Sequence, residues 1–147
     1  MRPIVATQPA QALGMLRRMP KAKRSPRALV VDDSEDVAES FARVLEAMGC
    51  EATFITNPYL AVETSRRIKP EVVFLDIGMP GVDGYELARV LRQQYGWDGL
   101  RIVAVTGYAT EEDRARSRRA GFDAHVVKPV SPELVESMLH TLFPDMR

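Results

Sequence analysis

The sequence predicts an α/β fold in which five parallel strands form one doubly wound sheet and five helices cover it. Two patterns carry this prediction. Short apolar runs of three or four residues, mostly β-branched, recur five times, as is typical of strands buried on both faces of a parallel sheet. Longer segments with apolar residues at helical spacing separate these runs. Alternation of this kind favours right-handed crossovers with helices on both sides of the sheet.

The first strand and helix set the pattern for the rest of the chain. The five strands are expected at 28–31, 53–55, 72–75, 102–105 and 124–127. The first helix is expected from an apolar stripe formed by Val37, Phe41, Val44, Leu45 and Met48. Gly49 follows this stripe and is predicted to be the C-cap.

The other four helices show similar signals. Apolar residues at helical spacing indicate the second helix at 60–68 and the third at 87–91. Thr110 is the predicted N-cap of the fourth, because acidic residues follow it and complement the helix dipole, and Gly121 is its predicted end. The fifth has Ser131 as N-cap and Pro132 at its first helical position.

The net charge of zero hides two oppositely charged parts. The 147 residues include 20 Lys+Arg and 20 Asp+Glu. Segment 1–27 holds seven of the basic residues and no acidic one, so the remaining 13 basic and 20 acidic residues give a net charge of −7. We interpret 1–27, which contains four prolines, as a basic flexible N-terminal extension and 28–147 as one folded domain.

Several classes of protein are excluded by composition. A single cysteine, Cys50, excludes a disulfide scaffold and a cysteine-rich zinc site. No apolar run approaches the length of a membrane span. The N-terminus lacks the apolar segment of a secretory signal, so we expect a cytoplasmic protein without a membrane partner.

The carboxyl ends of the predicted strands carry the residues with chemical function. Asp32 and Asp33 follow the first strand, and Asp76 ends the third. Three carboxylates at one edge of a sheet repel one another, and such hard oxygen ligands suit Mg²⁺. Thr106 and Lys128 end the fourth and fifth strands and supply contacts for an anion. This combination predicts a phosphoryl-transfer site with an aspartate as covalent acceptor. The chain has neither a P-loop nor a dinucleotide fingerprint, which argues against nucleotide binding.

These residues lie in motifs that resemble the receiver domain of two-component response regulators. The motifs are the Asp32-Asp33 pair within 30–34, the stretch 74–84 around Asp76, the Thr106-Gly107 pair, and 127–129 with Lys128. Their spacing also fits the family: 43 residues separate Asp33 from Asp76, and 52 separate Asp76 from Lys128. The resemblance extends from residue 28 to about residue 143. It implies a flavodoxin-like receiver fold with strand order 2-1-3-4-5.

The resemblance implies a role for each matched residue. Asp76 would accept a phosphoryl group from the phosphohistidine of a histidine kinase. Asp33 and Asp76 would bind Mg²⁺ directly, together with the main-chain carbonyl of Gly78, and Asp32 would act mainly through water. Thr106 and Lys128 would each contact a phosphoryl oxygen.

The resemblance also implies a switch and a controlled lifetime. His125 occupies the position of the family's switch residue, and the readout face would comprise the fourth helix, the fifth strand and the fifth helix. Gly78 and Tyr108 occupy positions that tune hydrolysis of the aspartyl-phosphate, and they predict slow autodephosphorylation. The Lys128–Pro129 bond is a candidate cis peptide. Gly84, after Asp83, is predicted to adopt a positive φ.

The leading function is therefore a stand-alone, phosphorylation-controlled signalling module that is not an enzyme in the ordinary sense. Its expected partners in phosphotransfer are a sensor or hybrid histidine kinase, a histidine phosphotransfer protein, or both. It is also expected to bind a downstream protein target, and a homodimer through the readout face is a further option. Nucleic acid is not expected, because no aromatic residue interrupts the basic segment. Two alternatives stay open: a receiver-like docking module that takes no phosphate, and a small aspartyl-phosphate phosphatase. Purely structural roles are also open for two of these sites: Asp32 and Asp33 would suit the cap of the first helix, and His125 would suit packing in the core.

Overall fold

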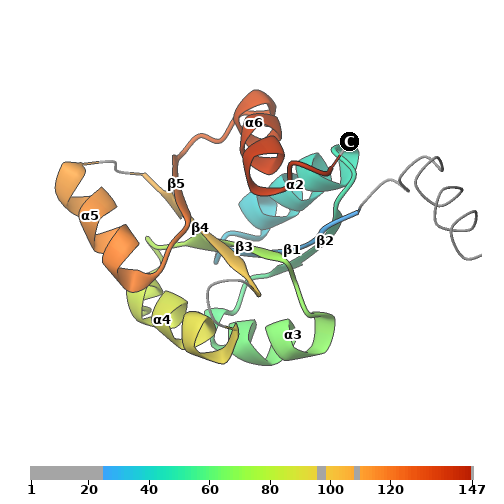
Figure 1. The fold of residues 1–147 in the computed structure, drawn as a ribbon. Helices are drawn as coiled ribbons and strands as arrows, with labels where there is room; N and C mark the ends of the chain where they lie inside the picture. Colours follow the sequence, from blue (N-terminus) through green and yellow to red (C-terminus); the bar gives the residue numbers. More distant parts are fainter. Residues whose placement is uncertain (1–24, 96–98, 108–109, 147) are drawn as a thin grey trace, which may run out of the picture.

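The computed structural model describes residues 25–95, 99–107 and 110–146. Their five strands form one parallel sheet in the order β2-β1-β3-β4-β5 (Figure 1). The strands are β1 (Arg27–Val31), β2 (Glu51–Ile55), β3 (Val72–Asp76), β4 (Arg101–Thr106) and β5 (Ala124–Val127). The predicted fold class and strand order are confirmed.

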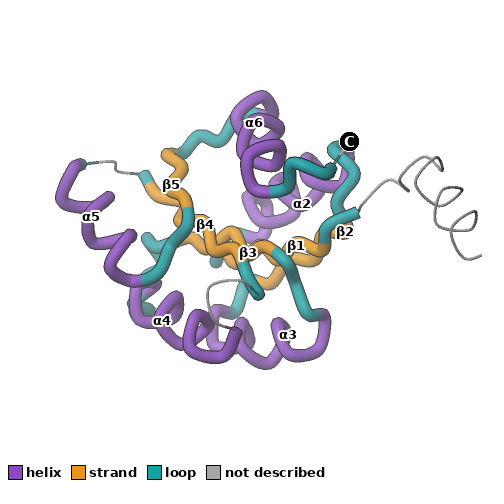
Figure 2. The backbone as a smooth tube through the Cα atoms, in the orientation of Figure 1, coloured by secondary structure: helices purple, strands orange, loops and turns teal. Residues whose placement is uncertain are grey.

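Five α-helices connect the described strands and follow the last of them. They are α2 (Glu35–Ala47), α3 (Ala61–Ile68), α4 (Gly84–Tyr95), α5 (Glu111–Ala120) and α6 (Pro132–Leu142), and a short 3₁₀ turn, η1 (Pro58–Leu60), precedes α3. Figure 2 shows them in two layers, with α2 and α6 on one face of the sheet and α3, α4 and α5 on the other. Among the described residues, no helix is long and apolar enough to cross a membrane.

The helix ends follow the sequence signals closely. Ser131 accepts a hydrogen bond from the Leu134 amide at the start of α6, and Pro132 is the first helical residue. Thr110 and Asp113 form a reciprocal capping box on α5, which satisfies two amide donors that the first turn leaves unpaired. Gly121 ends α5 with a φ of 100°. These predictions are confirmed.

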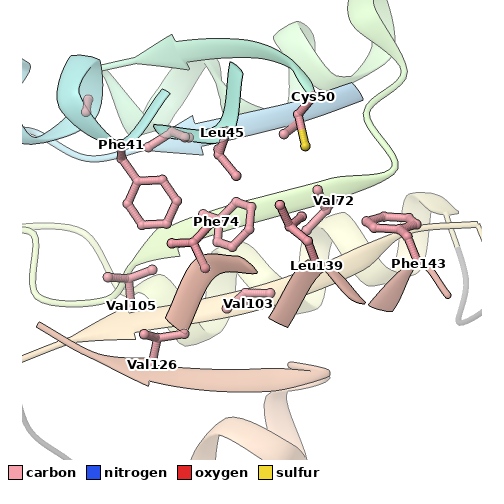
Figure 3. Packing of buried hydrophobic residues seen from close by; sticks show 14 of the residues in the cluster. Phe41, Leu45, Cys50, Val72, Phe74, Val103, Val105, Val126, Leu139 and Phe143 are labelled. Carbon is pink, nitrogen blue, oxygen red and sulfur yellow. The ribbon is translucent and has the colours of Figure 1, made fainter. Parts of the chain in front are cut away.

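Two hydrophobic cores lie on opposite faces of the sheet. One packs α2 and α6 against the sheet, and Figure 3 shows Phe41, Leu45 and Leu139 from the two helices meeting Phe74 and Val103. The other packs α3 and α4 against the second face of the same strands, through residues such as Leu91 and Ile102. Every residue of β3 is buried, which explains why its sequence is apolar without alternation up to Asp76.

Some predicted boundaries and positions differ from the structure. β2 begins two residues earlier than its apolar run, at Glu51, because the strand pairs with β1 along its whole length. Val37 was expected to face the core, but it is 41% exposed at the outer margin of the apolar face of α2. The C-cap of α2 is Met48, and Gly49 follows it with a φ of 95°.

The prediction for Gly84 was wrong. The positive-φ glycines among the described residues are Gly49, Gly81 and Gly121, and Gly81 makes the turn before α4. Gly84 is required for space instead: a Cβ at this position would lie 2.9 Å from the Cα of Ile77. The predicted basic extension falls, up to residue 24, outside the described residues.

Candidate functional site

Three carboxylates meet at the carboxyl-terminal edge of the sheet. Asp32 and Asp33 follow β1, and Asp76 is the last residue of β3, which is hydrogen-bonded to β1. One carboxylate oxygen from each lies within 4.8 Å of the other two. Asp32 and Asp76 are buried, whereas Asp33 is exposed. The cluster is therefore a pocket with two buried walls and one carboxylate at its mouth.

Lys128 holds two of these carboxylates together. Its ammonium donates to Asp32 at 2.9 Å and to Asp76 at 3.3 Å. Lys128 follows β5 at the far end of the same sheet edge, and its amide donates to the carbonyl of Thr106 at 2.7 Å. The Lys128–Pro129 peptide bond is cis, as the resemblance implied. The sheet thus brings residues 96 positions apart in sequence into direct contact.

The protonation equilibria of this pair reflect burial and charge. Burial is the main cause that raises the pKa of Asp76, and the charge of Asp32 raises it further, although the Gly78 amide and Lys128 act in the opposite direction. Burial alone would lower the pKa of Lys128, but the hydrogen bonds and charges of the two aspartates outweigh it and raise this pKa. Lys128 is therefore a cation at neutral pH.

The backbone beside Asp76 is fixed by a local hydrogen bond. The amide of Gly78 donates to Oδ1 of Asp76 at 2.8 Å. A Cβ at Gly78 would stand 3.4 Å from that same oxygen, so glycine keeps the approach to the carboxylate open. On the other side, Thr106 is buried at the end of β4, and a Cβ on the adjacent Gly107 would meet nothing within 4 Å. Gly107 therefore leaves space beside the end of β4.

His125 lies apart from the carboxylates, on β5. It is half-buried, and its Nδ1 is 3.1 Å from the Oγ of Ser117, a buried residue of α5. This contact links the predicted switch position to a neighbouring helix, and the sequence analysis did not anticipate Ser117. A small polar residue on the buried side of an otherwise charged helix is the signal that indicates it. Tyr108, the other predicted lifetime residue, lies outside the described residues.

A second feature that the sequence analysis missed lies beside the carboxylates. An apolar pocket of about 560 Å³ lies between α2, the end of β4 and the loop before α6, and Lys128 forms part of its wall. Val37, Phe41 and Val135 line it. Its location explains why Val37 is apolar although exposed. An apolar stripe wider than the buried face of α2 is the sequence signal that points to it.

The donor set at the carboxylates fits a divalent cation. Asp32, Asp33 and Asp76 offer three oxygens close enough to share one ion, and hard oxygen donors with room for water are the ligands that Mg²⁺ prefers. A hydroxyl and an ammonium stand at the same edge. Chemically, the arrangement can hold an anionic phosphorus group against a carboxylate nucleophile.

The comparison with known proteins agrees with this geometry. The family model described as the response regulator receiver domain matches residues 28–140. The chain belongs to the response regulator receiver family. It is 30% identical to the polar-differentiation response regulator DivK of Brucella anthropi, over 82% of this chain and 94% of that protein. It is 36% identical to an uncharacterized 14.6 kDa protein of Leptolyngbya boryana, over 71% of this chain and 79% of that one.

Solved structures agree on the receiver fold. The chemotaxis protein CheY4 of Vibrio cholerae superposes with a TM-score of 0.76 at 22% identity, covering 82% of this receiver and 100% of that chain. A CheY-like receiver domain protein of Methanospirillum hungatei superposes with a TM-score of 0.73 at 28% identity, covering 83% and 97%. The resemblance stated from the motifs is thus confirmed at the level of family and fold.

Proposed function

We propose that this receiver accepts a phosphoryl group on Asp76 from a phosphohistidine, with Mg²⁺ bound at Asp33, Asp76 and the main-chain carbonyl of Gly78. Asp32 acts mainly through water in this proposal, and Thr106 and Lys128 each contact a phosphoryl oxygen. The observation that supports it best is the contact of Lys128 with both Asp32 and Asp76, inside a cluster of three carboxylates. A purely structural salt bridge between Lys128 and the two buried aspartates would not need the third, exposed carboxylate of Asp33.

The proposed reaction is an in-line transfer between two side chains. A carboxylate oxygen of Asp76 attacks the phosphorus of the donor, so that an O–P bond forms as the N–P bond breaks. The leaving imidazole keeps the electron pair of that bond and takes up a proton. Mg²⁺, when bound, would offset the charge on the phosphoryl oxygens. Lys128 needs only to exchange one carboxylate oxygen for a phosphoryl oxygen, because its ammonium already lies at Asp76.

The first experiment is phosphorylation by a small donor such as acetyl phosphate, followed by intact-mass measurement. We expect a gain of one phosphoryl group with Mg²⁺, and no gain when the metal is chelated. The variant Asp76→Asn should gain nothing. A matched variant, Asp145→Asn, changes an exposed carboxylate near the C-terminus and should behave as wild type. A gain that persists in Asp76→Asn would contradict the proposal, and no gain in the wild type would favour the docking-module alternative.

The proposal extends to a switch on the face formed by α5, β5 and α6. His125 and Ser117 lie on β5 and α5 of this face, so a change at Thr106 can reach it through β4 and its paired strand β5. We propose that this face then binds and controls a downstream protein, or binds a second copy of the chain. In a third version, Asp76 passes its phosphoryl group on to a histidine phosphotransfer protein. The donor is a sensor or hybrid histidine kinase. The chain performs no turnover beyond its own phosphorylation and dephosphorylation, and it acts in the cytoplasm.

Binding to such partners should depend on phosphorylation. Pull-down from a lysate with and without beryllofluoride, a phosphoryl mimic, tests this dependence. We expect partners captured only with the mimic and lost in Asp76→Asn. Capture that is equal with and without the mimic would contradict switching.

Slow autodephosphorylation remains part of the proposal. Gly78 has no side chain to orient an attacking water, and Tyr108 is proposed to shield the phosphoryl group. The decay of phosphoprotein after removal of the donor should be faster in Tyr108→Ala than in the wild type. An unchanged decay rate would remove Tyr108 from this role.

A further inference from the structure

Helix α5 is held against the rest of the molecule mainly by polar contacts. Its buried residues are Ser117 and Ala120, which are both small, whereas the neighbouring α4 buries Tyr85 and Leu91. Because apolar burial stabilises in proportion to the buried area, a helix with so little of it opens more easily than one that packs large side chains. How firmly α5 is attached therefore depends on the polar contacts that its side chains make with other elements.

One of these contacts joins α5 to the start of α4. The Arg116 guanidinium lies over the ring of Tyr85, 4.1 Å from its centroid, and 3.9 Å from a carboxylate oxygen of Asp83. Tyr85 is buried, and its ring also meets Phe122 edge-on, with the ring centroids 6.1 Å apart. Asp83 is held in place as well, because it accepts a hydrogen bond from the Tyr85 amide at 3.0 Å. We call Arg116 together with Asp83 and Tyr85 the arginine latch.

The arginine latch lies one packing contact away from the backbone of Asp76. Gly84 stands between Asp83 and Tyr85 in the chain. It packs so closely on Ile77 that a Cβ at Gly84 would be 2.9 Å from the Cα of Ile77. Ile77 follows Asp76 directly. The position of α5 is thus linked, through the start of α4, to the segment that carries Asp76.

Two routes also connect α5 to Thr106, the last residue of β4. Thr110 is the N-cap of α5 and follows Thr106 by four positions, so the two residues lie at most about 14 Å apart along the chain. The second route passes through β5, where Val127 pairs with Thr106 in the sheet. On the same strand, Nδ1 of His125 lies 3.1 Å from the Oγ of Ser117 in α5. A displacement of Thr106 therefore acts on α5 at two points, whereas the latch fixes α5 at a third.

We propose that Arg116 is a positioning residue, which holds α5 in its unphosphorylated position and thereby slows phosphorylation of Asp76. The inference rests on the proposed function, in which Thr106 contacts a phosphoryl oxygen on Asp76. Because Thr106 and α5 are connected, that contact requires α5 to give way, and the latch opposes it. A contact can shift such an equilibrium only by the difference in its free energy between the two states. Exposed cation–π contacts and ion pairs are modest, so release of the latch should change rates by about two- to five-fold.

A purely steric role for Arg116 is the competing explanation, since the stem of an arginine can cover apolar surface without help from its charge. Methionine keeps much of this stem and removes the charge, whereas lysine keeps a cation that can lie over an aromatic ring. Asparagine at Asp83 keeps an acceptor for the cap of α4 and removes the ion pair. Arg114 provides the matched control, because it is exposed on α5 and residues two positions apart do not share a helix face.

The test measures two quantities in the full chain: hydrogen exchange of the α5 amides, and the rate of phosphorylation by acetyl phosphate with Mg²⁺. We expect R116M to exchange about two- to five-fold faster in α5 and to be phosphorylated faster by a similar factor. R116K should stay within about two-fold of wild type in both measurements, and D83N should fall between R116K and R116M. R114M should behave as wild type, and exchange in α2 and α6 should be unchanged in every variant.

The two measurements give separate ways to overturn the proposal. Unchanged exchange of α5 in R116M would mean that the charge of Arg116 does not hold the helix. Phosphorylation that is unchanged or slower in R116M would mean that the latch does not oppose it. Equal effects in R114M would indicate net charge as the cause, and faster exchange in α2 and α6 would indicate global destabilisation. If the wild type takes up no phosphoryl group, the proposed function fails and the coupling fails with it, while exchange in α5 still decides whether the latch holds that helix.

Discussion

Gly84 is a single residue whose replacement tests the packing between the loop after β3 and α4. Gly84 is the first residue of α4. Alanine has the higher helix propensity, by about 1 kcal/mol in a helix interior, so propensity predicts at most a stabilisation of this size at the helix start. The new Cβ would lie 2.9 Å from Ile77, a contact that includes backbone. We expect this clash to outweigh propensity and Gly84→Ala to destabilise the fold by about 1–3 kcal/mol in urea unfolding.

Gly107→Ala is the control for that measurement. A Cβ at Gly107 would meet nothing within 4 Å, so its free energy of unfolding should stay within about 0.5 kcal/mol of wild type. Equal effects of the two substitutions would mean that the Ile77 contact is not the cause.

Cys50 should be chemically inert in the folded chain. Burial, with a smaller contribution from the charge of Glu71, raises the pKa of its thiol to about 11. The reactive species is the thiolate, so the reactive fraction is small at pH 8 and grows only as the pH approaches that value. Iodoacetamide at pH 8 should alkylate Cys50 far more slowly in the native protein than in denaturant. Equal rates in the two conditions would contradict this burial.

At the scale of single residues, the sequence indicated which residues belong to the candidate site better than it indicated which side chains contact one another. Asp32, Asp76, Thr106 and Lys128 were found because a polar residue directly after an apolar strand is visible in the sequence. Ser117 was not singled out, because its significance depends on the position of His125 on a neighbouring element. Gly84 was recognised as special for the wrong reason, since a steric requirement from Ile77 is invisible to turn statistics.

Among the elements, α4 and α5 are joined by a side chain that crosses between them. Arg92, buried on α4, donates to the carbonyl of Gly121 at 2.7 Å and to Asp123 at 2.6 Å, and also to the carbonyl of Leu100. Asp123 in turn accepts from the Ile102 amide at 2.8 Å. One guanidinium thus fixes the end of α5 and the start of β4 to the same point on α4.

Removing this guanidinium should be costly. Arg92→Met keeps an apolar stem but removes the donor of two carbonyls and one of the donors of the part-buried Asp123 carboxylate, so we expect a loss of about 2–4 kcal/mol in urea unfolding. Arg89→Met is the matched control, because Arg89 pairs with Glu86 at the surface of the same helix, and such pairs contribute at most about 1 kcal/mol. A loss in Arg92→Met no larger than in the control would show that this network does not stabilise the fold.

The elements themselves were largely predictable, because capping and periodicity are local. Ser131, Pro132 and Thr110 act within one turn of their own positions, and the sequence specified them correctly. Strand ends were less predictable: Glu51 belongs to β2 because it pairs with Arg27, and a charged residue at a strand start gives no apolar signal. The exposure of Val37 also depends on how far α6 covers α2.

For the whole molecule, Mg²⁺ should act as a stabilising ligand. A ligand that binds only the folded state at 100 times its Kd contributes about 2.7 kcal/mol, so the melting temperature should rise by several degrees on saturation. Asp33→Asn should abolish this rise, and it should also stabilise the metal-free protein, because it removes one of three mutually repelling charges. Thermal melts of the wild type and of Asp33→Asn, with and without Mg²⁺, measure both the Mg²⁺-dependent rise in melting temperature and the stability of the metal-free protein. A full response in Asp33→Asn would place the ion elsewhere.

The overall architecture was predictable because α/β alternation leaves few topologies open. The strand starts form a second edge of the sheet, opposite to the edge that carries the carboxylates. The sequence analysis did not describe this second edge, although it follows because all five strands are parallel.

The contact of Lys128 with Asp32 and Asp76 has a consequence for the charge balance of the site. Three carboxylates, one ammonium and a divalent cation sum to zero, so the loaded site is neutral before reaction. An aspartyl-phosphate replaces a single negative charge by nearly two, and no further cationic side chain contacts these carboxylates among the described residues. In the proposed phosphorylated state this surplus charge needs dipolar partners, and we expect the Thr106 hydroxyl at the end of β4 to be one of them. The charge balance thus agrees with what the family resemblance implies, namely that phosphorylation draws the Thr106 segment towards Asp76.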